Sequence, residues 1–263
     1  MPDPIRLTPE LRERVWGRTS LAPWFPDPGR TIGEAWYLSD LDLPLLVKLI
    51  FTSERLSVQV HPDDGEDGPR GKSEMWHILD AEPGATIALG FREPITREHL
   101  LEATRTGEIE QLLNWVPVKM GETYYTPAHT VHAIGAGIVL VEIQQNSDVT
   151  YRLWDYGRPR ELHVEKAVPL CDLGVHPGAS PPIPVAEGRH ELVDSKHFIT
   201  ELVDLDVGRS LMPAAHTAQL WICIDGSGTI GGQPFRPGVV WYLPGPAEVK
   251  AETKARFLRT WTP

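Results

Sequence analysis

The sequence predicts an all-β protein made of two β-units with a few short helices. Its 263 residues include 23 glycines and 25 prolines, spread along the chain rather than repeated. Turn-forming residues between short apolar runs are typical of sheets, and several of these runs alternate apolar with polar residues. A chain of this length suits one large domain or two small ones, and either buries a substantial core.

The composition excludes several classes of protein. The formal net charge is −11, which disfavours nucleic acid or an anionic membrane as a partner. No apolar run approaches the ~20 residues that cross a bilayer, and the first twenty residues lack the apolar segment of a secretion signal. Two cysteines cannot form a disulfide framework. We therefore expect a cytoplasmic protein, and a local cluster of Lys and Arg would still admit a small anionic ligand.

An N-terminal helix is predicted at Pro9–Val15, within a loop-rich stretch. Thr8 suits the N-cap position, and proline suits the first helical position. Strand-like runs follow, and a helical pattern beginning at Thr96 interrupts them over Thr96–Thr106 and Ile109–Trp115. The expected strands of this unit are Ala35–Leu38, Leu45–Thr52, Leu56–Val60, Met75–Asp80, Thr86–Gly90, Thr123–Thr126, Val131–Ile134 and Ile138–Gln144.

Residues 171–190 form a predicted linker. The segment contains four prolines and three glycines and has little periodicity. We therefore predict an N-terminal unit over residues 1–170 and a smaller C-terminal unit over residues 191–263. The expected strands of the smaller unit are Phe198–Leu205, Ala218–Asp225, Thr229–Ile230, Val239–Leu243 and Arg256–Trp261.

A Gln-x-His pair occupies one predicted strand of the first unit. Gln59 and His61 share one face of this strand, while Val58 and Val60 point the other way into apolar packing. An amide oxygen and an imidazole nitrogen at this spacing are compatible with a bound metal. A half-buried strand with a hydrogen-bonded histidine has the same pattern, so the pair alone leaves both interpretations open.

The next strand carries a carboxylate among apolar neighbours. Lys72, Glu74 and Trp76 share a face, whereas His77 points to the other side as a packing or surface residue. An unpaired buried carboxylate is costly, so Glu74 requires a cation or a metal. An ordinary Lys72–Glu74 pair would also meet this requirement.

A third motif delivers a histidine to the head of a strand. His129 and His132 are three residues apart and would lie on opposite faces of a strand. We select His132, because Ile134 continues its strand and His129 falls in the preceding turn. Together the motifs supply a mixed set of N and O donors on neighbouring strands: Gln59, His61, Glu74 and His132. Such a set inside a barrel suits a catalytic zinc ion best, with iron, manganese or cobalt as alternatives.

The strand after these motifs ends in polar residues. Leu140, Glu142 and Gln144 share one face, and the apolar residues between them share the other. The polar run that follows is either a wet loop or the rim of a sugar-binding site, which makes Gln144 a candidate for ligand contact. Arg152 is a candidate cation among aromatic residues, and a surface arginine stacked on those rings is the alternative.

The order and spacing of these motifs resemble the short bacterial form of class I mannose-6-phosphate isomerase. The similarity runs over roughly residues 16–166 and is looser in the C-terminal third. The segments that carry it are Gly33–Trp36, Leu45–Lys48, Leu56–Asp64, Gly71–Trp76, Thr130–Gly135, Glu142–Gln145 and Thr150–Arg152.

This resemblance implies a cupin fold of two jelly-roll units with one zinc ion per chain. The implied reaction interconverts mannose 6-phosphate and fructose 6-phosphate through a cis-enediol(ate). The implied metal ligands are His61, Glu74, His132 and Gln59. The implied catalytic residues are Arg152, Glu142 and Lys72, and the sequence leaves open whether Glu142 or Lys72 carries the proton. The expected substrate contacts are Lys72, Arg152 and Gln144.

Other expectations complete this interpretation. The partner would be a small sugar phosphate, with neither nucleic acid nor membrane involved, and the chain would be a monomer or a homodimer. His129 stands where the family pattern has glycine, so it could alter the cavity mouth or compete for the metal. The C-terminal unit is expected to lack metal ligands, since His216 has no partner two residues away. The alternatives are a non-catalytic cupin that binds sugar or metal, an iron dioxygenase of the same fold, and a purely structural β-protein.

Overall fold

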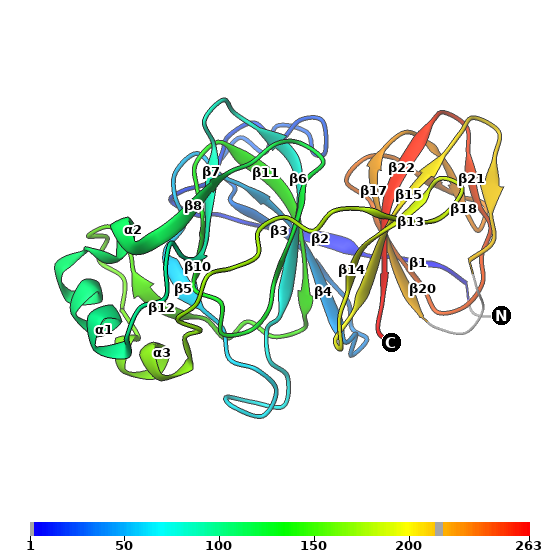
Figure 1. The fold of residues 1–263 in the computed structure, drawn as a ribbon. Coiled ribbons are helices and arrows are strands. Elements are labelled where there is room, and N and C mark those ends of the chain that lie inside the picture. The colour runs from blue at the N-terminus through cyan, green and yellow to red at the C-terminus, as the bar shows by residue number, and fades with distance from the viewer. Residues whose placement is uncertain (1–2, 214–217) are drawn as a thin grey trace.

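Two pairs of antiparallel sheets build the molecule in the computed structural model, which describes residues 3–213 and 218–263 (Figure 1). The N-terminal unit contains a six-stranded sheet in the order β2 (Thr8–Arg12), β3 (Glu34–Leu38), β4 (Leu45–Phe51), β11 (Ile138–Gln145), β6 (Glu74–Ala81) and β9 (Thr123–Thr126). The five-stranded sheet of this unit has the order β12 (Tyr151–Trp154), β5 (Val58–Val60), β10 (His132–Ile134), β7 (Thr86–Phe91) and β8 (Leu113–Pro117).

The C-terminal unit repeats this two-sheet plan with a larger and a smaller sheet. Its seven-stranded sheet has the order β1 (Ile5–Arg6), β20 (Val240–Leu243), β17 (Gln219–Asp225), β22 (Ala255–Trp261), β15 (Ile199–Leu205), β14 (Arg189–Asp194) and β13 (Ile183–Ala186). Its four-stranded sheet has the order β16 (Ser210–Leu211), β21 (Val249–Ala251), β18 (Gly228–Ile230) and β19 (Gln233–Phe235). The predicted all-β class is therefore confirmed.

The two faces of the six-stranded sheet belong to two different cores. On β11, Leu140 belongs to a hydrophobic cluster with Ile78 and Ile87 inside the N-terminal unit, whereas Val141 belongs to a cluster that includes Leu258 and is shared with the C-terminal unit. Burial of each such side chain contributes about 1.5–3 kcal/mol. The alternation predicted along β11 is confirmed, and it directs the even-numbered positions of this strand into the N-terminal unit.

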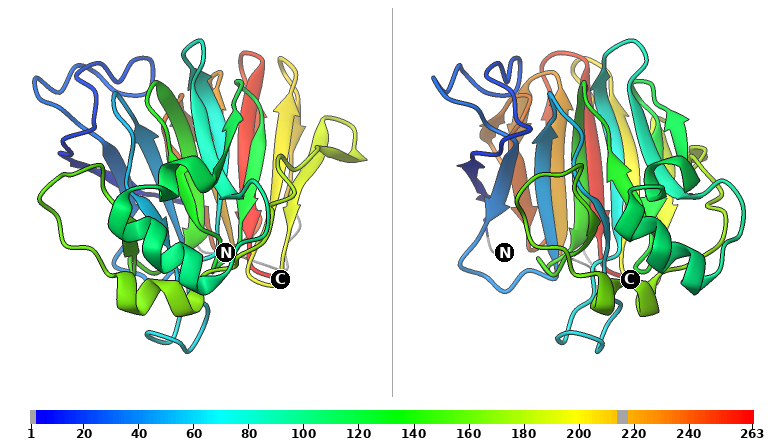
Figure 2. Two further views of the ribbon diagram at one scale, coloured as in Figure 1. Left: turned by 60° about the vertical axis from the view of Figure 1, so that its left-hand side comes forward. Right: turned by 90° about the vertical axis from the view of Figure 1, so that its left-hand side faces the viewer.

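Three short helices cover the outer face of the five-stranded sheet (Figure 2): α1 (Arg97–Thr106), α2 (Ile109–Leu112) and α3 (Val164–Leu170). The hydroxyl of Thr96 accepts a hydrogen bond from the backbone N–H of His99 at 3.1 Å, so the predicted cap is confirmed. Gly107 ends α1 with φ 85°, and a Cβ at this position would lie 3.0 Å from the ring of Trp154. None of the helices in the described part of the chain has the length and apolar character needed to span a lipid bilayer.

The helix predicted at Pro9–Val15 is wrong. Thr8–Arg12 is instead the edge strand β2, paired with β3 so that Leu11 opposes Ala35. An edge strand tolerates proline because one side of its backbone needs no partner, so pairing to β3 overrides the local helix-start signal. The consequence is that Arg12 becomes part of the sheet that forms the candidate site.

Two further segments differ from the prediction. The helical pattern over Ile109–Trp115 ends at Leu112, where strand β8 begins and pairs with β7. Residues 171–190 are not irregular throughout, because β13 and the start of β14 lie in this segment and pair as a hairpin. The N-terminal strand β1 pairs with β20 of the C-terminal unit, a long-range contact that local patterning does not reveal. His216 lies outside the described residues.

His77 lies on the face of β6 that packs toward the C-terminal unit, as a buried packing residue. Its ring shares a 2.9 Å hydrogen bond with the Thr123 hydroxyl. Burial, together with the nearby Arg256, lowers the pKa of His77 from 6.5 to about 4. The folded protein therefore holds this ring neutral at a pH where the unfolded chain protonates it.

We expect replacement of His77 by Gln to flatten the acid dependence of stability. Above pH 6.5 the imidazole is neutral in both states, and its contribution is fully present. As the pH falls toward 4, the unfolded chain binds the proton first and stability declines, by up to about 3 kcal/mol. Chemical denaturation between pH 4 and 7.5 measures the free energy of unfolding of His77→Gln and of wild type. The contributions of the other histidines are the same in both proteins and cancel in the difference. The control is His99→Gln at an exposed position; a difference that does not change with pH would contradict the prediction.

Candidate active site

Strand register places three of the predicted site residues in one row. On the five-stranded sheet, Gln59 of β5 lies opposite His132 on one side and opposite Arg152 on the other. Their neighbours Val58 and Val60 point outward into the core beneath the helices, as predicted. The row therefore faces the interior of the N-terminal unit. His61 follows directly after β5, and β6 begins with Glu74 on the facing sheet.

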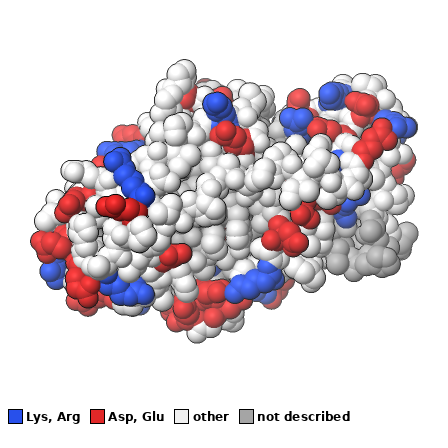
Figure 3. All heavy atoms as spheres, viewed as in Figure 1, with Lys and Arg blue, Asp and Glu red and all other residues white. Residues whose placement is uncertain are grey.

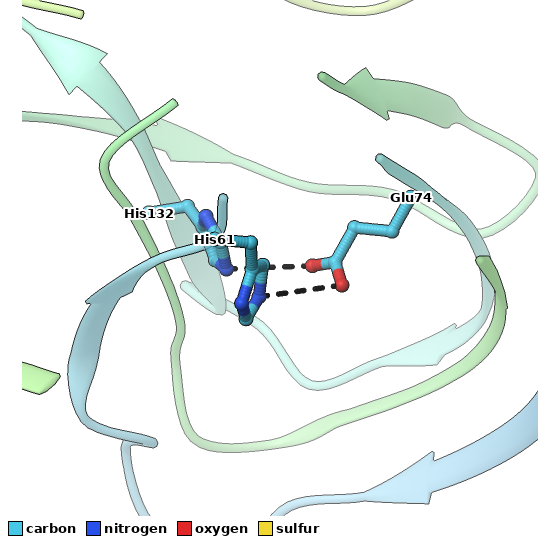
Figure 4. Close-up of side chains that lie close together, drawn as sticks. All are labelled: His61, Glu74 and His132. Carbon is cyan, nitrogen blue, oxygen red and sulfur yellow. Dashed lines mark ion pairs between the residues drawn. The ribbon is translucent and has the colours of Figure 1, made fainter. Parts of the chain in front are cut away.

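Two imidazole rings and one carboxylate converge in this interior (Figure 4). His61 Nε2 lies 3.5 Å from Glu74 Oε2, and His132 Nε2 lies 3.3 Å from Glu74 Oε1. The ligand atoms of the three residues all lie within 4.8 Å of one another, and all three side chains are buried. The Gln59 amide joins them through its nitrogen, 3.2 Å from His132 Nε2.

Both histidines are held in the form that binds metals. The Nδ1 atom of His61 lies 2.9 Å from the carbonyl oxygen of Val149, and that of His132 lies 2.8 Å from the carbonyl oxygen of Thr130. Each Nδ1 therefore donates its hydrogen to the backbone, which leaves both Nε2 lone pairs directed at the same region. Burial lowers the pKa of His132 to about 3 and that of His61 well below 6.5, so both rings are neutral at neutral pH.

The carboxylate is poorly satisfied by the protein alone. Neither oxygen of Glu74 accepts a well-formed hydrogen bond from a described residue, although Lys72 Nζ approaches Oε2 within 2.8 Å. Burial and the nearby Glu142 raise the pKa of Glu74 to about 7. A divalent cation would remove this penalty, and two neutral imidazoles, a carboxylate and an amide oxygen are donors that zinc accepts. The residues present therefore fit a metal, once the Gln59 amide rotates to present its oxygen.

A second buried charge pair lies beside this cluster. Glu142 accepts hydrogen bonds from Lys48 Nζ at 2.8 Å and from the Trp76 indole at 3.1 Å. Burial alone would raise the pKa of Glu142, but the ammonium groups of Lys48 and Lys72 lower it to about 2. Glu142 is therefore ionised at neutral pH. Against the effect of burial, Glu74 and Glu142 raise the pKa of Lys72, which stays protonated.

A polar cavity of about 380 Å³ opens next to these groups. Its lining includes four of the predicted residues: Gln59, Lys72, Glu142 and Arg152. Arg152 is half-buried, its Nη1 donates to the carbonyl oxygen of Glu161 at 2.6 Å, and its Nε has no partner among the described residues. The stacked arginines of this region are Arg55 and Arg158, which lie over the ring of Tyr156.

Gln144, which the sequence suggested as a ligand contact, lies apart from the described cavity lining. Its side chain is fully buried and does not line the cavity. The amide nitrogen donates to the carbonyl oxygens of Gln145 and Ser147, and the amide oxygen accepts from Lys48. Its side-chain nitrogen and oxygen thus both have partners within the protein. These hydrogen bonds hold Lys48 and the following loop in place.

His129 does not enter the cluster of ligand atoms. It has φ 73°, a left-handed conformation that explains why glycine is suited to this turn. Its Nε2 lies 2.7 Å from Glu66 Oε2, and its backbone N–H donates to the carbonyl oxygen of His61. The bulky side chain is therefore turned away from the metal-ligand atoms and tied to the loop before β6.

Several charged residues that line the cavity were not among the site residues predicted from the sequence: Arg12, Arg14, Lys48 and Arg160. One signal was present for Lys48, since a lone charge within a buried apolar strand calls for a partner. No comparable local signal marks the arginines, which reach the cavity through pairing of distant segments.

Together the fold and the site define a cupin-type protein with a His/Glu/His cluster inside its N-terminal unit. Mannose-6-phosphate isomerase ManA of Bacillus subtilis is 34% identical across 97% of this chain and 98% of its own length. The chain belongs to the mannose-6-phosphate isomerase family. The mannose-6-phosphate isomerase of Streptococcus mutans is 33% identical over 69% of the chain and 72% of its own length. No protein-family model matches the chain.

Solved structures agree with this assignment. The crystal structure of the mannose 6-phosphate isomerase from Bacillus subtilis superimposes with a TM-score of 0.88 and 28% identity, covering 98% of this chain and 99% of that one. A putative mannosephosphate isomerase from Archaeoglobus fulgidus has a TM-score of 0.79 over 100% of this chain and 99% of that one. Its 19% identity shows a shared fold alone.

Proposed function

We propose that the protein is a metal-dependent isomerase that interconverts mannose 6-phosphate and fructose 6-phosphate through a cis-enediol(ate). The observation that carries the proposal is the buried cluster of His61, Glu74 and His132 beside a cationic cavity, in a chain of this family. Every residue that lines the cavity comes from positions 12–160, which supports placing the site in the N-terminal unit, residues 1–170.

The proposed metal is one zinc ion per chain. Its ligands would be His61, Glu74 and His132, with the amide oxygen of Gln59 as the fourth. Nitrogen and oxygen donors without cysteine suit a catalytic rather than a structural zinc. When bound, the ion would supply a Lewis acid that stabilises negative charge on the sugar oxygens.

Arg152 is proposed to stabilise the enediolate. Loss of a proton from the carbon beside a carbonyl places negative charge on the neighbouring oxygens, and a fixed guanidinium meets that charge as it grows. Arg152 suits this role because it lines the cavity and the carbonyl oxygen of Glu161 orients it through Nη1, while its Nε has no hydrogen-bond partner among the described residues. A guanidinium remains charged at any working pH.

Glu142 and Lys72 are proposed to share the proton transfers. Their pKa shifts make Glu142 the ionised acceptor and Lys72 the protonated donor at neutral pH. A base with a pKa near 2 is weak, so substrate must loosen the contacts of Glu142 with Lys48 and Trp76 before it accepts a proton. This division of roles separates two residues that the sequence left equivalent.

A coupled assay with mannose 6-phosphate tests the proposal. We expect turnover by the purified protein, loss of activity to background after treatment with a chelator, and recovery when zinc is added back. Activity that survives complete removal of metal would contradict the metal-dependent mechanism. Oxygen uptake with iron and no isomerase activity would instead identify a dioxygenase of the same fold.

A further inference from the structure

The lining of the cavity carries an excess of basic side chains although the protein as a whole is acidic. The chain has a formal net charge of −11, and on the face shown in Figure 3 the described basic side chains are scattered among acidic ones. The described cavity lining nevertheless combines six basic with three acidic side chains: Arg12, Arg14, Lys48, Lys72, Arg152 and Arg160, against Glu34, Glu142 and Asp148. A concave site with an excess of one sign of charge concentrates ligands of the opposite sign.

Four of these basic groups are already neutralised by carboxylates. Lys48 pairs with Glu142 at 2.8 Å and Lys72 pairs with Glu74 at 2.8 Å, all four being buried. The remaining two pairs join an arginine to a shielded carboxylate: Arg14 with Glu34 at 2.6 Å and Arg160 with Asp155 at 2.5 Å. If Lys48, Arg14 or Arg160 bound a phosphate instead, each would leave a buried or shielded carboxylate without its partner. Lys72 is already assigned to proton transfer.

Arg12 differs from these four groups. Its carboxylate partner is Glu10, two residues away on the same edge strand, and the Glu10 side chain is 55% exposed. An exposed pair of this kind contributes little and exchanges readily. The guanidinium is held in place by the indole of Trp36, with Cζ 3.6 Å from the ring centroid. Arg12 is therefore fixed in position while its N–H groups can be transferred to a ligand.

The position of Arg12 suits the end of the substrate remote from the reacting carbons. Lys48 Nζ lies 4.2 Å from the same ring centroid and 2.8 Å from Glu142. The Trp36 ring and the Lys48 ammonium group thus connect Arg12 to Glu142, the proposed proton acceptor. Six covalent bonds join C2 of a hexose 6-phosphate to its phosphorus, so the sugar is long enough to extend from Glu142 toward Arg12.

We propose that Arg12, held on the Trp36 ring, binds the phosphate of the substrate and so gives the enzyme its preference for phosphorylated sugars. The inference rests on the proposed function and deepens it. A phosphate monoester carries about −1.5 to −2 charges at neutral pH. The guanidinium presents paired N–H donors that match two phosphate oxygens. Arg152 remains available for the enediolate at the other end.

Steady-state kinetics of Arg12→Gln tests the inference. We expect KM for mannose 6-phosphate and the inhibition constant for inorganic phosphate each to rise about 10- to 100-fold. The kcat/KM for unphosphorylated mannose should stay at the wild-type value. Glu10→Gln, which removes the competing carboxylate, should lower both constants or leave them unchanged. The matched control is Arg30→Gln, since Arg30 also pairs with an exposed carboxylate, Glu13 at 2.9 Å, and lies outside the cavity.

Each outcome decides the inference. Wild-type constants for phosphate and for mannose 6-phosphate in Arg12→Gln would overturn it, as would an equal loss with phosphorylated and unphosphorylated sugar. If Arg12→Gln unfolds, Arg12→Lys keeps the charge without the paired donors, and intermediate constants are then expected. Absence of any turnover by the metal-loaded wild-type protein would sink the proposed function instead, and so remains distinct from a failure at Arg12.

Discussion

Replacing Arg152 with alanine is expected to lower kcat for mannose 6-phosphate by about 10³-fold while one metal ion stays bound per chain. Removing a single preorganised donor to a developing oxyanion lowers kcat by about 10²- to 10³-fold. Because the Arg152 guanidinium also carries a full charge, we expect its loss to lie at the upper end of this range. Metal content should not change, because the side-chain hydrogen bond that Arg152 makes in the described structure is to the carbonyl oxygen of Glu161 and not to a proposed metal ligand. Steady-state kinetics with metal analysis of the same sample measures both quantities.

Two controls separate catalysis from structure at this position. Arg55→Ala removes an arginine that pairs with Glu110 and lies outside the cavity, so its kcat should equal that of wild type. Arg152→Lys keeps a charge but loses the planar fork, and we expect partial activity. Retention of full activity in Arg152→Ala would require a different stabiliser of the enediolate. Loss of metal in that variant would reveal a structural role.

Replacing Glu74 with glutamine is expected to abolish stoichiometric zinc binding and reduce isomerase activity to background. The other proposed ligands, His61, His132 and Gln59, are neutral, so Glu74 supplies the negative charge of the set. We expect zinc affinity to fall at least 100-fold, because the loss of a residue that only orients a metal ligand already lowers affinity by up to about 100-fold. Metal analysis after dialysis measures the loss, and thermal unfolding with and without zinc should show stabilisation of wild type alone.

The Glu74→Gln substitution also leaves a buried charge without its partner. Glu74→Gln leaves the buried Lys72 ammonium without its carboxylate, which destabilises the fold independently of metal. The double variant Glu74→Gln, Lys72→Met removes both charges and should recover stability without recovering zinc. Glu66→Gln is the control, since Glu66 pairs with His129 outside the ligand cluster. A full equivalent of zinc in folded Glu74→Gln would contradict the proposed ligand set.

Local sequence pattern predicted much of the N-terminal unit. Alternation assigned the buried and cavity faces of β11, and period-two spacing placed Gln59 on the inner face with Val58 and Val60 outside. It also separated His132 from His129, although turn geometry rather than strand parity sets the position of His129. These features were accessible because each depends on neighbours in the chain and on the two-residue repeat of a strand.

Pattern failed where distant segments override local preference. Thr8 and Pro9 carry a helix-start signal, but hydrogen bonding of Thr8–Arg12 to β3 makes this segment an edge strand. That pairing alone brings Arg12 beside Trp36. The partners of Gln144 also come from distant segments: it lies opposite Leu46 of β4, and its amide oxygen accepts a hydrogen bond from Lys48.

The sequence by itself determined that this chain folds as sheets and which histidines and carboxylates could share an ion. Tertiary structure decided which charged side chains pair with one another and which remain available to a ligand. Lys48 and Glu142 are 94 residues apart, yet adjacent strands make them neighbours. Strand pairing fixes such encounters, and a buried charge must find its partner among them.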